Sequence, residues 1–216
     1  MIHESFYWKK ELYDNFQVIA RFRFLKKRYE QSYVKIEKAI LMGAYIIRKL
    51  DEAQKIPPEF LKTQESISLY KSKGTIVDFM NWHHLERHYN LEQTHTENKD
   101  WGFILNQVIH SYSLVYTFDS NDKPDGLLIN SDWTKKKSLF AIPLKLILTM
   151  FLKISEGDIT SASSQREIKG KDNQGKVIYG EMKLRNANYS NPMNIDIPTE
   201  IEKTMKGEIY KRVEFE

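Results

Sequence analysis

Asn106 and His110 are the residues whose types and spacing first suggest chemistry. They are four apart in residues 101–110, which we expect to form a helix capped by Asp100. At about 100° per residue, one apolar stripe of this helix comprises Trp101, Ile104, Leu105, Val108 and Ile109. Asn106 and His110 share the roughly opposite face, so the imidazole is expected to point away from the core, where it can act as a general base. A purely structural role is the alternative, because a histidinium at the end of a helix interacts favourably with the helix dipole.

The stretch Asn106-Gln107-Val108-Ile109-His110-Ser111-Tyr112 resembles the helix-borne Arg-Asn-x-x-x-His motif of the HEPN superfamily. HEPN domains are helical bundles, and many are metal-independent endoribonucleases of toxin or antiviral defence systems. The resemblance implies that Asn106 and His110 are catalytic and that Tyr112 is the aromatic residue often found beside them. It also implies a homodimer, because the family's arginine and histidine meet across two protomers. Leu105 stands where the family has its arginine, so a cation for the phosphate must come from elsewhere in the fold or from a second copy.

A histidine-rich stretch invites a metal-site interpretation. His84 and His88 are four apart in residues 76–91, which we expect to be a helix, and such a pair can hold a metal ion. Only His95 is a candidate third ligand, and the chain has no cysteine. We therefore expect no metal site here and interpret the stretch as a polar helix face.

A second nuclease pattern combines Asp125 with Glu181 and Lys183, which have the residue types of a PD-(D/E)xK site. Asp125 lies in a run of turn-forming residues. The alternative interpretation is that Asp125 belongs to a hairpin turn and that Glu181 and Lys183 lie on the solvent-facing side of a strand. The sequence has no glycine-rich phosphate loop, no dinucleotide-binding fingerprint and no nucleophile elbow. We expect no cofactor.

The N-terminal region is basic. Residues 1–49 hold eleven lysines and arginines against five acidic residues. A candidate nucleic-acid-binding cluster within it comprises Arg21, Arg23, Lys26, Lys27 and Arg28. Such a stripe can hold phosphates while the interleaved aromatic residues stack on bases. Alternatively, the aromatic residues belong to the core and the charged residues lie on the solvent-facing side of the same helices.

Composition limits the remaining function classes. The 216 residues are 41% hydrophobic with a formal net charge of +4, enough for a sizeable core and only mildly basic. The absence of cysteine excludes disulfides, thiolate metal sites and cysteine nucleophiles. Neither of the longest apolar runs, residues 39–47 and 140–152, reaches the roughly 20 residues of a membrane span. We expect a cytoplasmic protein with no membrane partner.

The first fifty residues are expected to be helical, because no glycine or proline occurs from His3 to Met42. An apolar seam at steps of three or four comprises Leu12, Phe16, Ile19, Phe22, Leu25, Tyr29, Tyr33, Ile36, Ile40, Ala44 and Ile47. One helix over residues 5–53 would be roughly 70 Å long. We therefore expect either a break at Gln31-Ser32 or packing against a partner chain.

The pattern changes to β in the second half of the chain. Residues 59–71 and 76–91 are expected to be helices and residues 95–100 a loop. Expected strands follow at residues 112–118, 127–129, 139–142, 166–169 and 176–184. Pro143 begins one more helix, and residues 186–192 have the composition of a loop.

This order predicts an α+β fold, in which long N-terminal helices form a bundle and a mostly antiparallel sheet with one embedded helix follows. Residues 1–216 are expected to form one domain. A subdivision into a helical part, 1–110, and a strand-rich part, 111–216, is the alternative.

Two functions of different class remain. The first is an interaction protein, a dimeric scaffold that contacts protein or nucleic acid, and it predicts an exposed apolar patch along the seam. The second is a HEPN-like endoribonuclease, intact or degenerate. It predicts His110 in a cleft or at a two-fold interface, within reach of an arginine or lysine.

Overall fold

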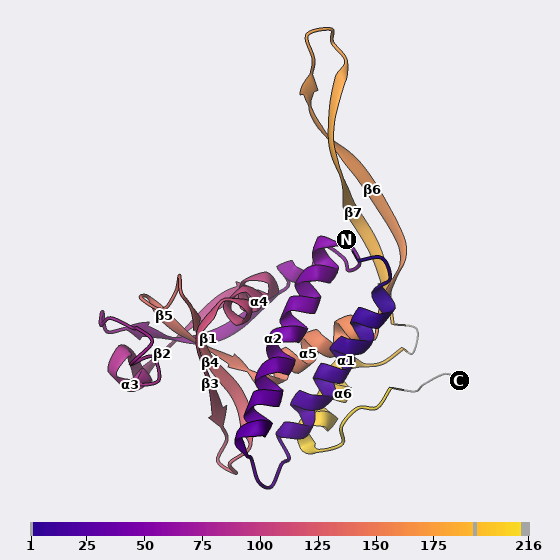
Figure 1. Ribbon diagram of the computed structural model, residues 1–216. Coiled ribbons are helices and arrows are strands. Elements are labelled where there is room, and N and C mark those ends of the chain that lie inside the picture. The colour runs from indigo at the N-terminus through magenta and orange to yellow at the C-terminus, as the bar shows by residue number, and fades with distance from the viewer. Residues whose placement is uncertain (1, 192–193, 213–216) are drawn as a thin grey trace.

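The computed structural model describes residues 2–191 and 194–212 and begins with two antiparallel helices (Figure 1). Helix α1 (Ser5–Phe22) packs against α2 (Glu30–Glu52). The break between them therefore comes earlier than the predicted Gln31-Ser32, which lie in the first turn of α2. Glu30 favours a helix start here, since its carboxylate lies at the positive end of the helix dipole.

The apolar seam of these helices faces inward. Leu12, Phe16, Ile36 and Ile40 are completely buried, and only the linker residues Leu25 and Tyr29 are exposed. The expectation of an exposed patch along the seam is therefore wrong. Its residues form the core, because α1 and α2 close on each other and on helix α5 (Leu144–Ser155).

The segment after α2 differs most from the prediction. The expected helix at residues 59–71 is a short 3₁₀ helix η1 (Phe60–Lys62) followed by strand β1 (Gln64–Ser72). The expected helix at 76–91 is a loop, the short helix α3 (Leu85–His88) and the start of strand β2 (Tyr89–Asp100), which also takes up the expected loop at 95–100. Alternating Ile67 and Leu69 are buried in β1, so pairing on both sides of this strand overrides its helix propensity.

The expected antiparallel sheet forms, but it begins before residue 111, because β1 and β2 belong to it. Its other strands are β3 (Ser111–Phe118), β4 (Pro124–Ser131) and β5 (Ser138–Pro143), and the order is β2-β1-β5-β4-β3. Helix α4 (Trp101–Ile109) leads into β3, and α5 begins directly after Pro143. Together with the two N-terminal helices before it, this sheet makes the fold α+β, as predicted.

The main core lies between the sheet and the helices. It joins side chains from both sides of residue 111, among them Leu12, Ile40, Ile129, Phe151 and Ile201. A smaller cluster of Val77, Leu85, Tyr89 and Leu139 packs separately from the main core. Gly43 of α2 permits close packing, since a Cβ there would lie 2.0 Å from the ring of Phe151.

Strands β6 (Asp158–Lys171) and β7 (Val177–Ser190) form a separate two-stranded hairpin that projects far from the body (Figure 1). We call β6, β7 and their turn at residues 172–176 the arm. The expected strands at residues 166–169 and 176–184 both lie within the arm. Strand β7, however, continues to Ser190 through most of the expected loop at 186–192. Residue 192 lies outside the described residues. Helix α6 (Ile197–Lys206), which the sequence analysis did not predict, follows. None of the helices in residues 2–191 and 194–212 is long and apolar enough to cross a membrane.

Candidate functional site

The end of α4 carries two of the predicted catalytic residues. Asp100 caps the helix as expected, accepting a hydrogen bond from the Phe103 amide at 2.7 Å. Asn106 and His110 are both exposed, and the His110 amide donates to the Asn106 carbonyl at 3.0 Å. The predicted orientation of the two side chains away from the core is therefore confirmed.

A guanidinium from another helix contacts the motif. Arg48 of α2 donates from Nη1 to Oδ1 of Asn106 at 2.6 Å, and its Nε contacts Glu52 at 3.2 Å. Leu105, at the position of the HEPN arginine, is 2% exposed and belongs to the core. No sequence pattern points to Arg48, because the contact joins residues 58 positions apart.

Tyr112, the third predicted residue, lies under a lysine. The ammonium of Lys135, in the loop between β4 and β5, is 3.4 Å from the centre of the Tyr112 ring. The same ammonium pairs with Asp132 at 2.6 Å. Desolvation by burial is the largest single influence on the pKa of Lys135 and lowers it, but the interactions with Asp132 and Tyr112 together outweigh burial, so the pKa of Lys135 is raised.

Strand register brings three segments to one end of the sheet. Ser111 pairs with Ser131, and Lys71 pairs with Ser138, so the start of β3 and the loops after β1 and before β5 emerge together. The Ser72 amide also donates to the Lys137 carbonyl at 2.9 Å. We call residues 73–84, 110–112 and 132–137 the sheet end.

Large apolar side chains are exposed at the sheet end. The exposed fractions are 88% for Trp133, 80% for Ile76, 78% for Phe79 and 69% for Met80. Lys136 and Lys137 beside Trp133 are exposed as well. Large apolar side chains that are this exposed and lie at one end of a sheet are candidates for an interaction surface.

The loop that carries Trp133 is held in place by buried groups. The carboxamide oxygen of Gln107 accepts from the Ser131 amide at 3.1 Å and from the Thr134 hydroxyl at 2.7 Å. The Tyr89 hydroxyl donates to the Lys135 carbonyl at 2.7 Å. Trp133 is thus exposed on an ordered backbone.

The loop that carries Phe79 is equally well bonded. Oδ1 of Asp78 accepts from the amides of Met80 and Asn81 at 2.9 and 3.2 Å. His88 is buried, and its ring nitrogens lie 2.7 Å from the Thr75 hydroxyl and 3.1 Å from the Asn81 carbonyl. His88 is therefore a structural residue.

The two metal patterns do not form sites in the structure. Asp125 accepts a hydrogen bond from the Thr117 hydroxyl at 2.6 Å on the sheet, whereas Glu181 and Lys183 lie on the arm. Lys183 pairs with Glu167 at 2.8 Å. Across the described part of the chain, no three histidine or acidic side chains gather in a way that could hold a metal ion.

The basic N-terminal cluster divides into bonded and solvent-facing residues. Arg23 pairs with Asp119 at 2.8 Å and Arg28 with Asp122 at 3.0 Å, so both hold the turn between β3 and β4. The pKa of Asp119 is lowered, mainly because its carboxylate accepts a hydrogen bond from the Lys123 amide. The pairing with Arg23 lowers this pKa further. Arg21 donates to Gln17 at 3.2 Å. Lys26 and Lys27 are exposed.

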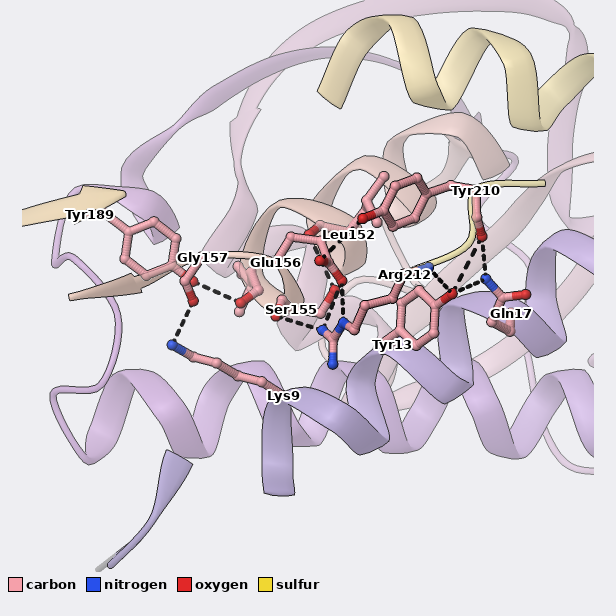
Figure 2. Close-up of polar contacts among 11 residues, drawn as sticks. Lys9, Tyr13, Gln17, Leu152, Ser155, Glu156, Gly157, Tyr189, Tyr210 and Arg212 are labelled. Carbon is pink, nitrogen blue, oxygen red and sulfur yellow. Dashed lines mark hydrogen bonds and ion pairs between the residues drawn. The ribbon is translucent and has the colours of Figure 1, made fainter. Parts of the chain in front are cut away.

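A buried polar cluster connects the arm to the body (Figure 2). Lys9 of α1 donates to the Gly157 carbonyl at 2.8 Å and pairs with Asp158 at 2.7 Å. Burial lowers the pKa of Lys9, and Asp158 only partly offsets this. The Tyr189 hydroxyl, on the returning strand, donates to the Ile154 carbonyl at 2.7 Å. We call Lys9, Gly157, Asp158 and Tyr189 the joint.

The same cluster fixes the segment after α6. Buried Glu156 accepts from Nε of Arg212 at 2.8 Å and from the Tyr210 hydroxyl at 3.3 Å. The Tyr13 hydroxyl accepts from the Arg212 amide at 2.7 Å and from Gln17 at 2.9 Å (Figure 2). These groups are bonded to one another, so the cluster serves the architecture of the fold.

Comparison with protein-family models, with curated proteins and with solved structures gives no match. The resemblance to the HEPN superfamily therefore stays a prediction.

Proposed function

We propose that this protein is an interaction protein that binds single-stranded nucleic acid at the sheet end. The observation that carries the proposal is Trp133, which is 88% exposed on a loop with a well-bonded backbone. An aromatic ring held in this way is a stacking platform, and every base has a face that stacks on it. Phe79 offers a second ring at the same end of the sheet.

Lysines beside the aromatic rings favour nucleic acid over a protein partner. Lys136 and Lys137 are exposed in the same loop as Trp133, and Lys73, exposed at the start of the neighbouring loop, donates to the Glu86 carbonyl at 2.9 Å. Phosphates are the natural partners of such ammonium groups. The cores of protein–protein interfaces, in contrast, are depleted of lysine.

The binding test uses a fluorescent uridine RNA of about 20 nucleotides, long enough for a single-strand site, and its DNA counterpart in an anisotropy titration. Stacking of one base contributes ~1–3 kcal/mol, so Trp133→Ala should weaken binding by about fivefold to 150-fold. Tyr7→Ala is the matched control, because Tyr7 is an aromatic residue of α1 that is 70% exposed.

Absence of binding by the unaltered protein would refute the proposal. An equal loss of affinity in Tyr7→Ala would do so as well, because the aromatic residues of the sheet end would then have no special part.

Metal-independent cleavage of bound RNA is the second candidate function, and the contact of Arg48 with Asn106 favours it. In this hypothesis the His110 imidazole takes the proton of the 2′-hydroxyl, whose oxygen attacks phosphorus to form a 2′,3′-cyclic phosphate. The bond to the 5′-oxygen breaks, and this oxygen leaves as a hydroxyl with a proton from solvent. Arg48 stabilises the phosphate charge in place of the arginine that Leu105 replaces. The predicted homodimer would bring a second such cluster to the site.

The cleavage test incubates the protein with RNA in EDTA. Cleavage should persist in EDTA and fall at least about a hundredfold in His110→Ala, as is typical for loss of a general base. Arg48→Ala should show a similar loss, and sedimentation should show a dimer. Intact RNA in every reaction would eliminate this candidate but leave the binding proposal standing.

A further inference from the structure

The arm is a ribbon of two strands with its side chains in solvent. Each strand has 14 residues, so the ribbon is about 45 Å long at ~3.4 Å per residue. Its outer part projects away from the sheet and the helices (Figure 1), whereas Gln54, just after α2, bonds the β7 backbone at Met182 and Leu184 at 3.3 and 2.8 Å. An isolated two-stranded ribbon is only marginally stable in water.

Most acidic groups of the arm are already bonded. Glu167 pairs with Lys183 at 2.8 Å, and Asp158 pairs with Lys9 at 2.7 Å in the joint. Oδ1 of Asp172 accepts from the amides of Gln174 and Lys176 at the turn, each at 2.9 Å. Glu181 is the remaining acidic residue of the arm.

Most cations of the arm, in contrast, face solvent. Among the residues that the structure describes, no salt bridge involves Arg166, Lys169, Lys171, Lys176 or Arg185 of the arm. All five are exposed. These five cations stand against Glu181 and Asp172, whose bonds to neutral backbone amides leave its charge in place, so the arm is electropositive and complementary to a polyanion.

The dimensions of the arm fit one kind of polyanion. The major groove of B-form DNA is wide enough for a two-stranded β-ribbon, whereas that of A-form RNA is too narrow and deep. Ile168 and Tyr179 are paired across the strands and exposed near the outer half of the arm. Apolar side chains at this place can contact thymine methyl groups in the groove.

The arm is poorly suited to the alternative of adding a strand from a protein partner. Lysines occur on both strands, and the register shifts at four places along the pair. Edge lysines and bulges of this kind oppose pairing with a further strand.

The joint fixes the direction in which the arm leaves the body. The base of β6 is bonded to Lys9, and the Tyr189 ring packs on Phe60 with 4.9 Å between ring centres. A Cβ at Gly157 would lie 2.0 Å from the Tyr189 ring, so the backbone and the ring are in close contact. A pre-oriented arm loses less entropy on binding than a flexible one.

We infer that the arm binds in the major groove of double-helical DNA. This contact is a second nucleic-acid site, separate from the single-strand site proposed at the sheet end, and it does not depend on that site.

The experiment measures binding of a DNA duplex of about 25 base pairs as a function of salt. Lys169, Lys171 and Lys176 are replaced by alanine together, and the control replaces Lys10, Lys35 and Lys38, three exposed lysines of α1 and α2. The arm variant should bind at least about tenfold more weakly, and its salt slope should fall by ~0.9 for each phosphate that the protein no longer neutralises. The control should match the unaltered protein, and Trp133→Ala should keep its duplex affinity.

A second measurement on the unaltered protein removes any dependence on the folding of the variant. Bound protein should protect guanine N7 from dimethyl sulfate, since that atom lies in the major groove. The inference is overturned by unprotected N7, by equal losses in the arm and control variants, or by duplex RNA binding as tightly as DNA. Loss of single-strand binding alone in Trp133→Ala would leave it intact.

Discussion

Tyr89 shows how a single residue positions the candidate site. Its ring is completely buried, and its hydroxyl donates to the Lys135 carbonyl and accepts from Nδ2 of Asn130 at 2.8 Å. The first of these bonds holds the loop that presents Trp133. The exposure of Trp133 therefore depends on a hydroxyl that does not itself reach the surface.

Tyr89→Phe tests this dependence. The change leaves two buried polar partners unsatisfied, so the free energy of unfolding should fall by about 1–3 kcal/mol. Single-strand affinity should also fall, by less than in Trp133→Ala. Urea unfolding at about pH 8, below the ordinary tyrosine pKa, measures the first effect. Tyr7→Phe, at an exposed position of α1, should leave both quantities unchanged. A fully stable variant with full affinity would contradict the role given to Tyr89.

Alkaline pH tests the same hydroxyl. Burial raises the pKa of Tyr89 to about 12 from the ordinary value of 10.0. The folded state thus holds the phenolic proton more tightly than the unfolded state. The stabilisation is fully present below pH ~10 and is lost as pH rises through about 12. Unfolding measured from about pH 9 to about pH 12 should show a smaller decline in Tyr89→Phe than in the unaltered protein.

Residue types alone predicted part of the site. Helix geometry placed Asn106 and His110 on the exposed face, because the apolar residues of α4 define the buried one. Trp133 could not be found in this way, since a lone tryptophan in a turn has no periodicity that tells whether it is exposed. Arg48 was missed because its contact with Asn106 is set by packing between α2 and α4.

At the scale of elements, the joint decides whether the arm has a defined direction. Lys9 on α1 and Tyr189 on β7 hold the arm from both sides of Gly157 (Figure 2). Since Gly157 is in close contact with the Tyr189 ring, a larger residue would have to displace that ring.

Gly157→Ala should therefore lower the free energy of unfolding by about 1–3 kcal/mol, the usual effect of overpacking. Limited proteolysis should cut the arm faster, and duplex affinity should decrease. Gly180→Ala is the control on the same arm for stability and proteolysis, because its Cβ would lie 3.0 Å from the flexible end of Lys169 and 3.4 Å from Cβ of Glu167. Equal behaviour of the two variants would show that the joint does not orient the arm.

Element types were predictable where one periodicity ran unbroken. Helices α1 and α2 follow from a long seam at helical spacing. Strand β2 was expected partly as a loop, because it is an edge strand whose residues 92–98 are polar and mostly exposed. Its pairing with β1, for example Glu65 with Lys99, joins distant residues, and sequence patterns carry no direct sign of such contacts.

At the scale of the whole molecule, a single body supports two exposed surfaces of different shape. The sheet end presents aromatic rings on short, bonded loops, whereas the arm presents cations along a ribbon. Both surfaces carry apolar side chains that the core leaves in solvent. Such an arrangement suits a protein that holds two parts of one nucleic acid.

The overall shape was the least predictable feature. Alternation marks a strand only when one face is buried, and the arm buries neither face along most of its length. Residues 186–190 therefore looked like a loop, although they extend β7. The α+β class could be predicted from the sequence, because the order of helices and strands depends on local patterns.

Ultraviolet crosslinking of the unaltered protein to a uridine RNA, followed by mass spectrometry, tests the central claim most directly. Binding at the sheet end predicts crosslinks in the peptide that contains Trp133, with a second group at Phe79. Crosslinks confined to the linker lysines Lys26 and Lys27 or to the arm, with none at the sheet end, would contradict it.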